Sequence, residues 1–282
     1  MITHFVLMIA STASLCQAGG WMLADKGKAK AVIVVAKDAS EPEQHAAKEL
    51  AAFLKQVTGG EFAIVNQAGG DRSRILVGEA AVKSVDPSFS VGDLGQDGLI
   101  IRTAGKDLYL AGGQPRGTLY AVYTFLEDQV GCHWWSSKVS TIPHKPTLAT
   151  AELNVRYVPP LEYRESFWYD AFDGDFAVRN KCNGNSERLD AKRGGKQIYE
   201  GFVHTFYHLI PPEKYFKDHP EWFSEIKGKR THEHAQLCLT NEEMRKELVE
   251  NLKKHLRKNP VATIASVSQN DCHNNCQCAK CA

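Results

Sequence analysis

An apolar, β-branched run near the end of the chain constrains the fold most. Val261–Val267 is followed at once by the polar cluster Ser268-Gln269-Asn270-Asp271. A buried parallel strand has this form where it delivers polar side chains to the mouth of an α/β barrel. Just upstream, the capping box Thr240-x-x-Glu243 opens an amphipathic helix that ends at Pro260. A helix followed directly by such a strand favours a parallel sheet, most simply part of a TIM (β/α)8 barrel.

The second part of the chain, residues 161–282, continues this alternation. We predict strands at 162–168, 201–209 and 236–239, and a helix at 173–180. A complete barrel takes about 250 residues, and roughly 200 at minimum. We therefore expect residues 161–282 to hold three or four βα units, the first portion of a truncated barrel that is inactive alone.

Residues 29–155 predict a separate α+β domain with a mixed sheet and helices on one face. One helix begins at the capping box Ser40-x-x-Glu43 and ends at Gly59-Gly60, and a second ends at Gly131. Strands are expected at 30–35, 62–65, 74–77, 98–103 and 107–111, with a turn at Gly105-Lys106. Prolines 143, 146, 159 and 160 indicate a linker between the two parts.

Composition excludes several classes of partner. Of the 282 residues, 43% are hydrophobic and 24% charged, as in a globular chain, and the formal net charge is +1. This balance gives no reason to expect nucleic acid or an anionic membrane as partner. No apolar run reaches the roughly 18 residues of a membrane span. No motif specifies an oligomeric state.

Residues 1–18 resemble a signal peptide. Phe5–Leu15 is apolar or small, and a cut after Ala18 would have small residues at the expected positions. The segment before this run has only His4 and no Lys or Arg, so a buried N-terminal strand is the alternative. A signal peptide predicts an exported protein, periplasmic or extracellular, in a compartment that permits disulfides.

The first part resembles a known accessory domain. The motif Leu110-Ala111-Gly112-Gly113-x-x-Arg116-Gly117-Thr118-Leu119-Tyr120, followed by Gly131-Cys132-x-Trp134-Trp135, is similar to the domain that precedes the barrel in α-glucuronidases and β-hexosaminidases. In those enzymes it packs beside the catalytic barrel and is not catalytic. The resemblance implies structural roles for Arg116 and Trp134, with sugar stacking by Trp134 or Trp135 as the alternative.

The second part contains a series of motifs in order: Phe172–Asn180, His204-x-Phe206, His219–Phe223, Gln236–Asn241 and Ser266–Asp271 with the C-x-C-x-x-C motif. In these motifs it resembles the group called domain of unknown function 4838, which includes glycoside hydrolase family 163. Family 163 members are endo-β-N-acetylglucosaminidases that act on N-glycans. The resemblance implies an exported hydrolase of O-glycosidic bonds in N-acetylglucosamine-containing glycans, without a cofactor. The alternatives are an α-glucuronidase-like hydrolase, a non-catalytic carbohydrate-binding protein and a zinc-stabilised structural module.

Asp271 and Asn270 are the candidate catalytic residues. They follow a predicted barrel strand, where catalytic groups usually lie. Glycoside cleavage needs a proton donor and a second group, which can be the substrate's acetamide held by a carboxylate. By analogy with related N-acetylhexosamine enzymes, this pair would orient the acetamide or donate the proton. Alternatively Asp271 only caps the following turn. A second carboxylate is expected beyond residue 282.

Five further residues are candidate substrate contacts. Arg164, Glu165, Trp168 and Asp170 cluster at the end of the first predicted barrel strand, and His204 lies in a motif of the second part. Trp168 could stack on a sugar face. Arg164 and Glu165 could instead form an ion pair in the barrel wall, and His204 could be a structural histidine.

Seven cysteines follow the predicted signal peptide, an odd number for an exported chain. Cys276, Cys278 and Cys281, with Cys272 or His273, could form a tetrahedral zinc site. The rival is a disulfide from this group to Cys238 or Cys182, and free thiols are the third alternative. The sequence leaves all three open.

Overall fold

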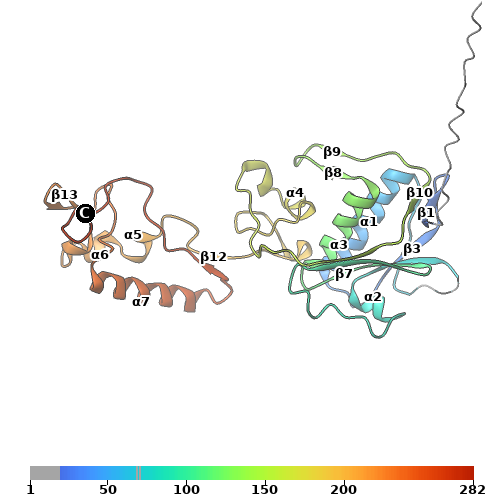
Figure 1. Cartoon of the computed structure of the whole chain (residues 1–282), viewed down its shortest axis with the longest axis horizontal. Coiled ribbons are helices and arrows are strands. Elements are labelled where there is room, and N and C mark those ends of the chain that lie inside the picture. Colours follow the sequence, from blue (N-terminus) through green and yellow to red (C-terminus); the bar gives the residue numbers. More distant parts are fainter. Residues whose placement is uncertain (1–19, 68, 70) are drawn as a thin grey trace, which may run out of the picture. The chain divides into compact units, whose positions relative to one another are not determined.

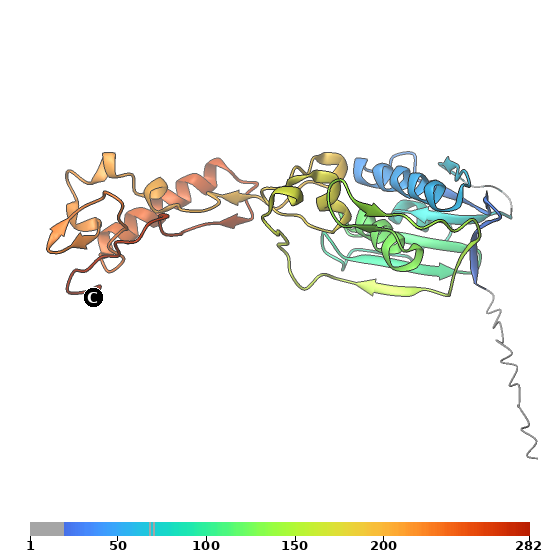
Figure 2. The same cartoon turned by 90° about the horizontal axis from the view of Figure 1, so that it is seen from above.

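The structure of the chain is a computed structural model that describes residues 20–67, 69 and 71–282. The predicted signal peptide, residues 1–18, lies outside the described residues. The chain divides into two compact units. The first runs to residue 160 and includes 191–194, and the second comprises 161–190 and 195–282. Figures 1 and 2 show the elements of each unit.

A six-stranded mixed sheet forms the centre of the first unit, in the order β11-β6-β7-β5-β3-β4. Its strands are β3 (Ala31–Val35), β4 (Ile64–Val65), β5 (Ser73–Val77), β6 (Leu99–Ala104), β7 (Asp107–Gly112) and β11 (Asn154–Tyr157). Strands β4, β3, β5 and β7 pair in parallel, and β6 runs antiparallel to both β7 and β11. The expected mixed sheet is confirmed.

Helices cover both faces of this sheet, so the expectation of helices on one face only is wrong. Helices α1 (Glu41–Thr58) and α3 (Gly117–Phe125) lie on one side, and α2 (Glu79–Lys83) lies on the other (Figure 1). Every residue of β3 is buried, as in a strand covered on both faces. Val82 of α2 packs with Val32 and Tyr109 in the second apolar layer. A helix as short as α2 carries too few periodic positions to be read from sequence.

Local signals set the ends of these elements as expected. The Glu43 carboxylate accepts hydrogen bonds from the backbone N–H and the hydroxyl of Ser40, at 3.0 and 2.9 Å. Helix α1 ends at Gly59, which has φ +79° and donates its N–H to the carbonyl of Lys55. Gly105, at φ +58°, lies in the turn between β6 and β7. Glycine reaches such left-handed angles without the steric cost that a Cβ brings.

Smaller sheets complete the first unit. A three-stranded sheet has the order β10-β1-β2, and β8 pairs with β9. The bounds are β1 (Trp21–Asp25), β2 (Lys28–Ala29), β8 (His133–Trp134), β9 (Ser140–Thr141) and β10 (Leu148–Thr150). Strand β1 and the first residue of β2 precede residue 29, so the compact unit includes residues upstream of the predicted 29–155 domain. Helix α3 continues as the π-helical segment η1 (Leu126–Val130) and ends at Gly131.

Two residues of the first motif are buried in the first unit. The Arg116 guanidinium donates to Asp97 at 2.6 Å and to the Gln96 side chain at 2.8 Å. Trp134 is buried and makes edge contacts with the rings of Phe53 and Tyr123. Both arrangements fit the structural roles that we expected, and burial removes Trp134 as a platform for a sugar.

The second unit has short regular elements around a small core. Its helices are α4 (Gly174–Arg179), α5 (Phe206–Leu209), α6 (Pro212–Tyr215) and α7 (Glu242–Lys258), with the short helical turns η2 (Tyr169–Phe172) and η4 (Pro220–Trp222). A third short turn, η3 (Ala191–Arg193), belongs to the first unit. Its strands are β12 (Tyr199–Glu200), β13 (Glu225–Ile226), β14 (Lys229–Arg230) and β15 (Ile264–Ala265). The core includes Phe223, Leu237, Met244 and Leu248. Strand β15 pairs in parallel with β12.

Most strands predicted for this unit are shorter than expected or absent. Residues 162–168 form no strand, because the side chain of Asn183 binds the N–H of Arg164 and the carbonyl of Glu162 at 2.9 and 2.8 Å. These backbone groups are then satisfied without a β ladder. Residues 201–209 contain helix α5, and 236–239 contribute one isolated bridge from Leu237 to Phe223.

The parallel pairing of β15 with β12 is the one element of a parallel sheet in the described part of the second unit. The described residues show no closed barrel, and the barrel stays a prediction.

Helix α7 begins one residue later than the predicted capping box would place it. Its N-cap is Asn241, whose side-chain oxygen accepts from the N–H of Met244 at 3.0 Å.

Candidate functional site

The polar residues after β15 are tied to the residues that open α5. The hydroxyl of Thr205 donates to the carbonyl of Ser266 and accepts from the N–H of Ser268, both at 2.9 Å. The N–H of Phe206 donates to the carbonyl of Ser268 at 3.0 Å. These bonds bring His204 beside the polar cluster, and its Nδ1 lies 2.9 Å from the carbonyl of Gln269. We call His204, Asn270 and Asp271 the strand-end group.

Within this group, both polar atoms of the Asn270 side-chain amide are hydrogen-bonded. Its Oδ1 accepts from the N–H of Tyr207 at 3.3 Å, and its Nδ2 donates to the carbonyl of Ala235 at 2.9 Å. Asp271 is exposed. The arrangement therefore leaves the Asp271 carboxylate open to solvent, while the Asn270 side chain links three segments of the unit. His204 is also exposed and has the left-handed φ of +55°, a conformation that is uncommon for a non-glycine residue.

Arg164 and Glu165 lie in a second group, formed by residues 161–190. The guanidinium of Arg164 donates to the carbonyls of Lys181 and Leu161, at 2.8 and 2.6 Å. The Oε2 atom of Glu165 accepts from the Tyr163 hydroxyl and from the N–H of Ser186. The Oε1 atom of Glu165 is buried, and it has no hydrogen-bond partner among the described residues.

Glu187, which the sequence did not single out, lies in the same group. Its Oε2 accepts from the N–H of Gly184, and its buried Oε1 has no hydrogen-bond partner among the described residues. Burial raises the pKa of Glu187 to about 7, and the negative charge of Glu165 adds to this shift. Glu187 follows a polar, glycine-containing segment with no apolar periodicity, so nothing in the local pattern signals its burial.

Trp168 belongs to a run of exposed aromatic side chains. Phe167, Trp168 and Tyr169 are 58%, 51% and 85% exposed. The Trp168 ring meets that of Phe176 edge-on, with the ring centroids 6.3 Å apart. Asp170 is half-buried in η2, the short turn that follows. Adjacent exposed aromatic rings are uncommon on a surface without a binding role, and they offer apolar platforms with polar edges.

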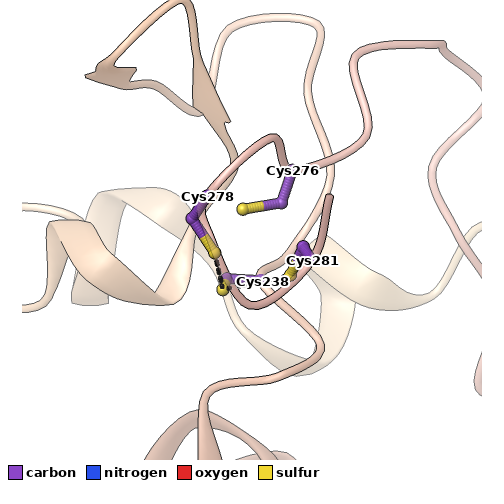
Figure 3. Close-up of side chains that lie close together, drawn as sticks. All are labelled: Cys238, Cys276, Cys278 and Cys281. Carbon is purple, nitrogen blue, oxygen red and sulfur yellow. Dashed lines mark hydrogen bonds between the residues drawn. The ribbon is translucent and has the colours of Figure 1, made fainter.

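Four cysteine thiols meet in the second unit (Figure 3). Those of Cys238, Cys276, Cys278 and Cys281 all lie within 4.8 Å of one another. We call these residues the four-cysteine cluster. The fourth member is Cys238, so the expectation that Cys272 or His273 completes the group is wrong. Cys272 lies outside the cluster, and its sulfur accepts from the Gln236 side chain at 3.3 Å.

The sulfurs of the cluster are too far apart for a disulfide. The Sγ of Cys238 is 3.7 Å from those of Cys278 and Cys281, whereas a disulfide bond is about 2.05 Å long. A disulfide to Cys238 was one expected alternative, and the structure has Cys238 as a free thiol. Cys182, the other proposed partner, is likewise not in a disulfide. A hydrogen bond from the backbone N–H of Lys280 lowers the pKa of Cys278 to about 6.

A second set of metal-type side chains joins β12 to α5 and α7. His208 Nε2 lies 3.0 Å from His255 Nδ1, which lies 3.2 Å from the carboxylate of Glu200. Asn259 donates to the other carboxylate oxygen at 2.9 Å, and this hydrogen bond lowers the pKa of Glu200. These polar atoms hydrogen-bond one another, which accounts for their proximity.

No helix within the described part of the chain is both long and apolar enough to cross a membrane.

The comparisons with known proteins place the chain among proteins related to glycoside hydrolases. The model of the glycosyl hydrolase family 67 N-terminus matches residues 22–125. The model described as domain of unknown function (DUF4838) matches residues 134–282, more than half of the chain. The chain therefore belongs to the DUF4838 family.

The curated relatives match less than half of the chain. Proteins described as probable α-glucuronidase A from Aspergillus oryzae and from Aspergillus flavus are each 31% identical to it over 109 residues. That alignment covers 38% of this chain and 13% of each relative. The chain thus spans a small fraction of the length of these relatives.

Solved structures show weaker likeness. A family 115 4-O-methyl-α-glucuronidase with specificity for decorated arabinogalactans is 15% identical, with a TM-score of 0.43 over 64% of this chain and 29% of its own. A Streptomyces plicatus N-acetyl-β-hexosaminidase is 13% identical, with a TM-score of 0.39 over 82% of this chain and 41% of its own. TM-scores this low do not establish a common fold.

Proposed function

We propose that the chain is part of an exported glycoside hydrolase that cleaves O-glycosidic bonds in N-acetylglucosamine-containing glycans, as an endo-β-N-acetylglucosaminidase does. Membership in the DUF4838 family supports this reading. Export rests on the apolar and small residues of segment 1–18. The barrel that would complete such a site is part of the proposal.

The strand-end group is the observation that carries the proposal. An exposed carboxylate, Asp271, directly follows Asn270, whose side chain is fixed by two hydrogen bonds. Fixing the preceding residue positions the segment that carries Asp271, and positioned carboxyl groups are what glycoside cleavage requires. We assign Asp271 to the acetamide or to the leaving oxygen of the substrate. Asn270 then acts as a positioning residue, and His204 lies beside this pair.

An α-glucuronidase-like specificity is the second candidate. It is favoured by the match of residues 22–125 to the family 67 N-terminus and by the two Aspergillus relatives. Both candidates are hydrolases of O-glycosidic bonds, and they differ in the sugar bound. A non-catalytic carbohydrate-binding protein would bind a sugar through the exposed rings of Phe167, Trp168 and Tyr169.

Binding of two ligands by the purified chain separates these candidates. We would titrate it with a chitobiose-core N-glycan and with a glucuronic-acid-substituted oligosaccharide, and measure affinity by calorimetry. We expect saturable binding of the N-glycan, weakened about tenfold or more in Asp271→Asn because a hydrogen bond to a charged group is lost. The matched control is Asp218→Asn, which changes another exposed carboxylate.

The outcomes are distinct. Selective binding of the glucuronic-acid ligand would replace the first candidate with the second, and binding of neither would contradict both. Because the described residues show no closed barrel, we expect the chain to bind without cleaving, and release of the N-glycan by the chain alone would overturn that expectation.

A further inference from the structure

The four-cysteine cluster joins segments that are far apart in the sequence. Cys238 follows the bridge between Leu237 and Phe223, and its N–H donates to the carbonyl of Trp222 at 2.8 Å. Cys276, Cys278 and Cys281 come from the last turn-rich segment, which has no helix or strand of its own. The backbone of that segment meets β13 where the N–H of Gln277 donates to the carbonyl of Glu225 at 2.7 Å.

The spacing of the sulfurs fits a tetrahedral metal site. Zinc binds thiolate sulfur at about 2.3 Å, and the edge of a regular tetrahedron with that radius is about 3.8 Å. The Sγ of Cys238 lies 3.7 Å from the Sγ atoms of both Cys278 and Cys281. Cys238 thus has two equally distant neighbours, a pattern that a metal ion requires and that a single disulfide does not.

Apolar packing does not account for the cluster. Cys238, Cys276 and Cys278 are buried and form a packing group with Cys281 that contains no aliphatic or aromatic side chain. The neighbouring apolar core is a separate group that includes Phe223, Leu237 and Met244. Four thiols that bury one another gain little from the hydrophobic effect compared with Val or Leu at the same positions.

Polar donors surround the sulfurs. The N–H of Glu225 donates to the Sγ of Cys276 at 3.3 Å, and the Arg230 guanidinium lies 3.6 Å from the same sulfur. The hydroxyl of Thr240 lies 3.0 Å from the Sγ of Cys281. Donors and a cation in this outer layer compensate the negative charge that four thiolates around a divalent ion carry.

We propose that Cys238, Cys276, Cys278 and Cys281 bind one Zn²⁺ ion as a structural site. Four protein ligands close the coordination sphere, so the ion has no open position for substrate or water. It fastens residues 276–281 to Cys238 and, through the surrounding donors, to the β13–β14 hairpin. A small unit with few long elements gains stability from such a cross-link, because metal binding adds directly to the free energy of folding.

Metal analysis of the purified chain tests the site. We expect about one zinc per chain by mass spectrometry, and no intramolecular disulfide among the four cysteines. The Cys278→Ser and Cys238→Ser variants should lose most of the zinc, since three thiolates bind it far more weakly than four. The matched controls are Cys272→Ser and Cys182→Ser, which alter cysteines outside the cluster and should keep the full zinc content.

A conservative ligand exchange keeps the test valid if the serine variants fail to fold. Cys238→His retains a zinc ligand, and after Co²⁺ replaces Zn²⁺ its visible spectrum should change from that of four sulfur ligands to that of three sulfurs and one nitrogen. Absence of zinc from the folded wild-type chain with four reactive thiols would overturn the proposal. So would disulfides among these cysteines, or loss of zinc from Cys272→Ser equal to that from Cys238→Ser.

Discussion

The side chain of Gln236 binds the backbone of Asn270 at both its donor and its acceptor. The Oε1 atom of Gln236 accepts from the N–H of Asn270 at 2.8 Å, and its Nε2 donates to the carbonyl of Asn270 at 2.9 Å. Gln236 is buried, and the same Nε2 also donates to the carbonyl of Cys272 at 2.7 Å. One amide side chain thus satisfies the backbone N–H and carbonyl that a neighbouring strand would otherwise pair, in the segment that carries Asp271.

Replacing Gln236 with Ala should destabilise the second unit. The change leaves the N–H and the carbonyl of Asn270 without these partners, and unsatisfied buried groups cost about 1–3 kcal/mol. Chemical denaturation followed by fluorescence would measure the loss. Gln269→Ala is the matched control, because Gln269 is exposed in the same segment. Equal effects of the two variants would show that the paired hydrogen bonds of Gln236 contribute nothing specific.

Arg116→Met should destabilise the first unit by about 3–5 kcal/mol, because the change removes the buried guanidinium that pairs with the carboxylate of Asp97. The control is Arg156→Met, since Arg156 pairs with Asp93 at a largely exposed site and such pairs contribute about 1 kcal/mol or less. Thermal unfolding of both variants measures the difference. A loss for Arg116→Met no larger than that for Arg156→Met would contradict the structural role of this ion pair.

Much of the first unit is predictable because its signals are local. The Ser40 and Glu43 capping box, the Gly59 helix end and the Gly105 turn each depend on residues that are adjacent in sequence, and each lies where the pattern predicts. The second helical face of the sheet was missed, because α2 spans only Glu79–Lys83 and packs through contacts with distant strands.

The second unit departs further from its sequence pattern because side chains, rather than strand ladders, satisfy its backbone. Asn183 replaces a strand partner at Arg164, as Gln236 does at Asn270. The spacing of the last cysteines indicated a metal-type motif, but the identity of the fourth thiol, Cys238, depends on a tertiary contact 40 residues away from Cys278 in the sequence. Burial of Glu187 likewise depends on the fold of a loop.

Glu187 predicts a pH dependence of stability. Its pKa is raised from 4.5 to about 7 in the folded chain, so the folded state holds a proton that the unfolded state releases. The stability from this group is therefore fully present below about pH 4.5 and is lost as pH rises to 7, by up to about 3 kcal/mol. Glu187→Gln, which stays neutral, should remove this decline in urea unfolding between these pH values. Glu233→Gln, at an exposed position, should keep the decline.

Trp168 provides the most direct test, outside the strand-end group, of the proposal that the chain binds a glycan. Its ring is 51% exposed beside Phe167 and Tyr169, which suits stacking against the apolar face of a sugar. We expect Trp168→Ala to weaken binding of the chitobiose-core glycan by about 1–2 kcal/mol, roughly 5- to 30-fold, as for an aromatic anchor at an interface. Trp135→Ala removes a ring that is 60% exposed in the first unit, and it should leave affinity unchanged. A loss of affinity in Trp135→Ala with none in Trp168→Ala would move the sugar-binding surface to the first unit.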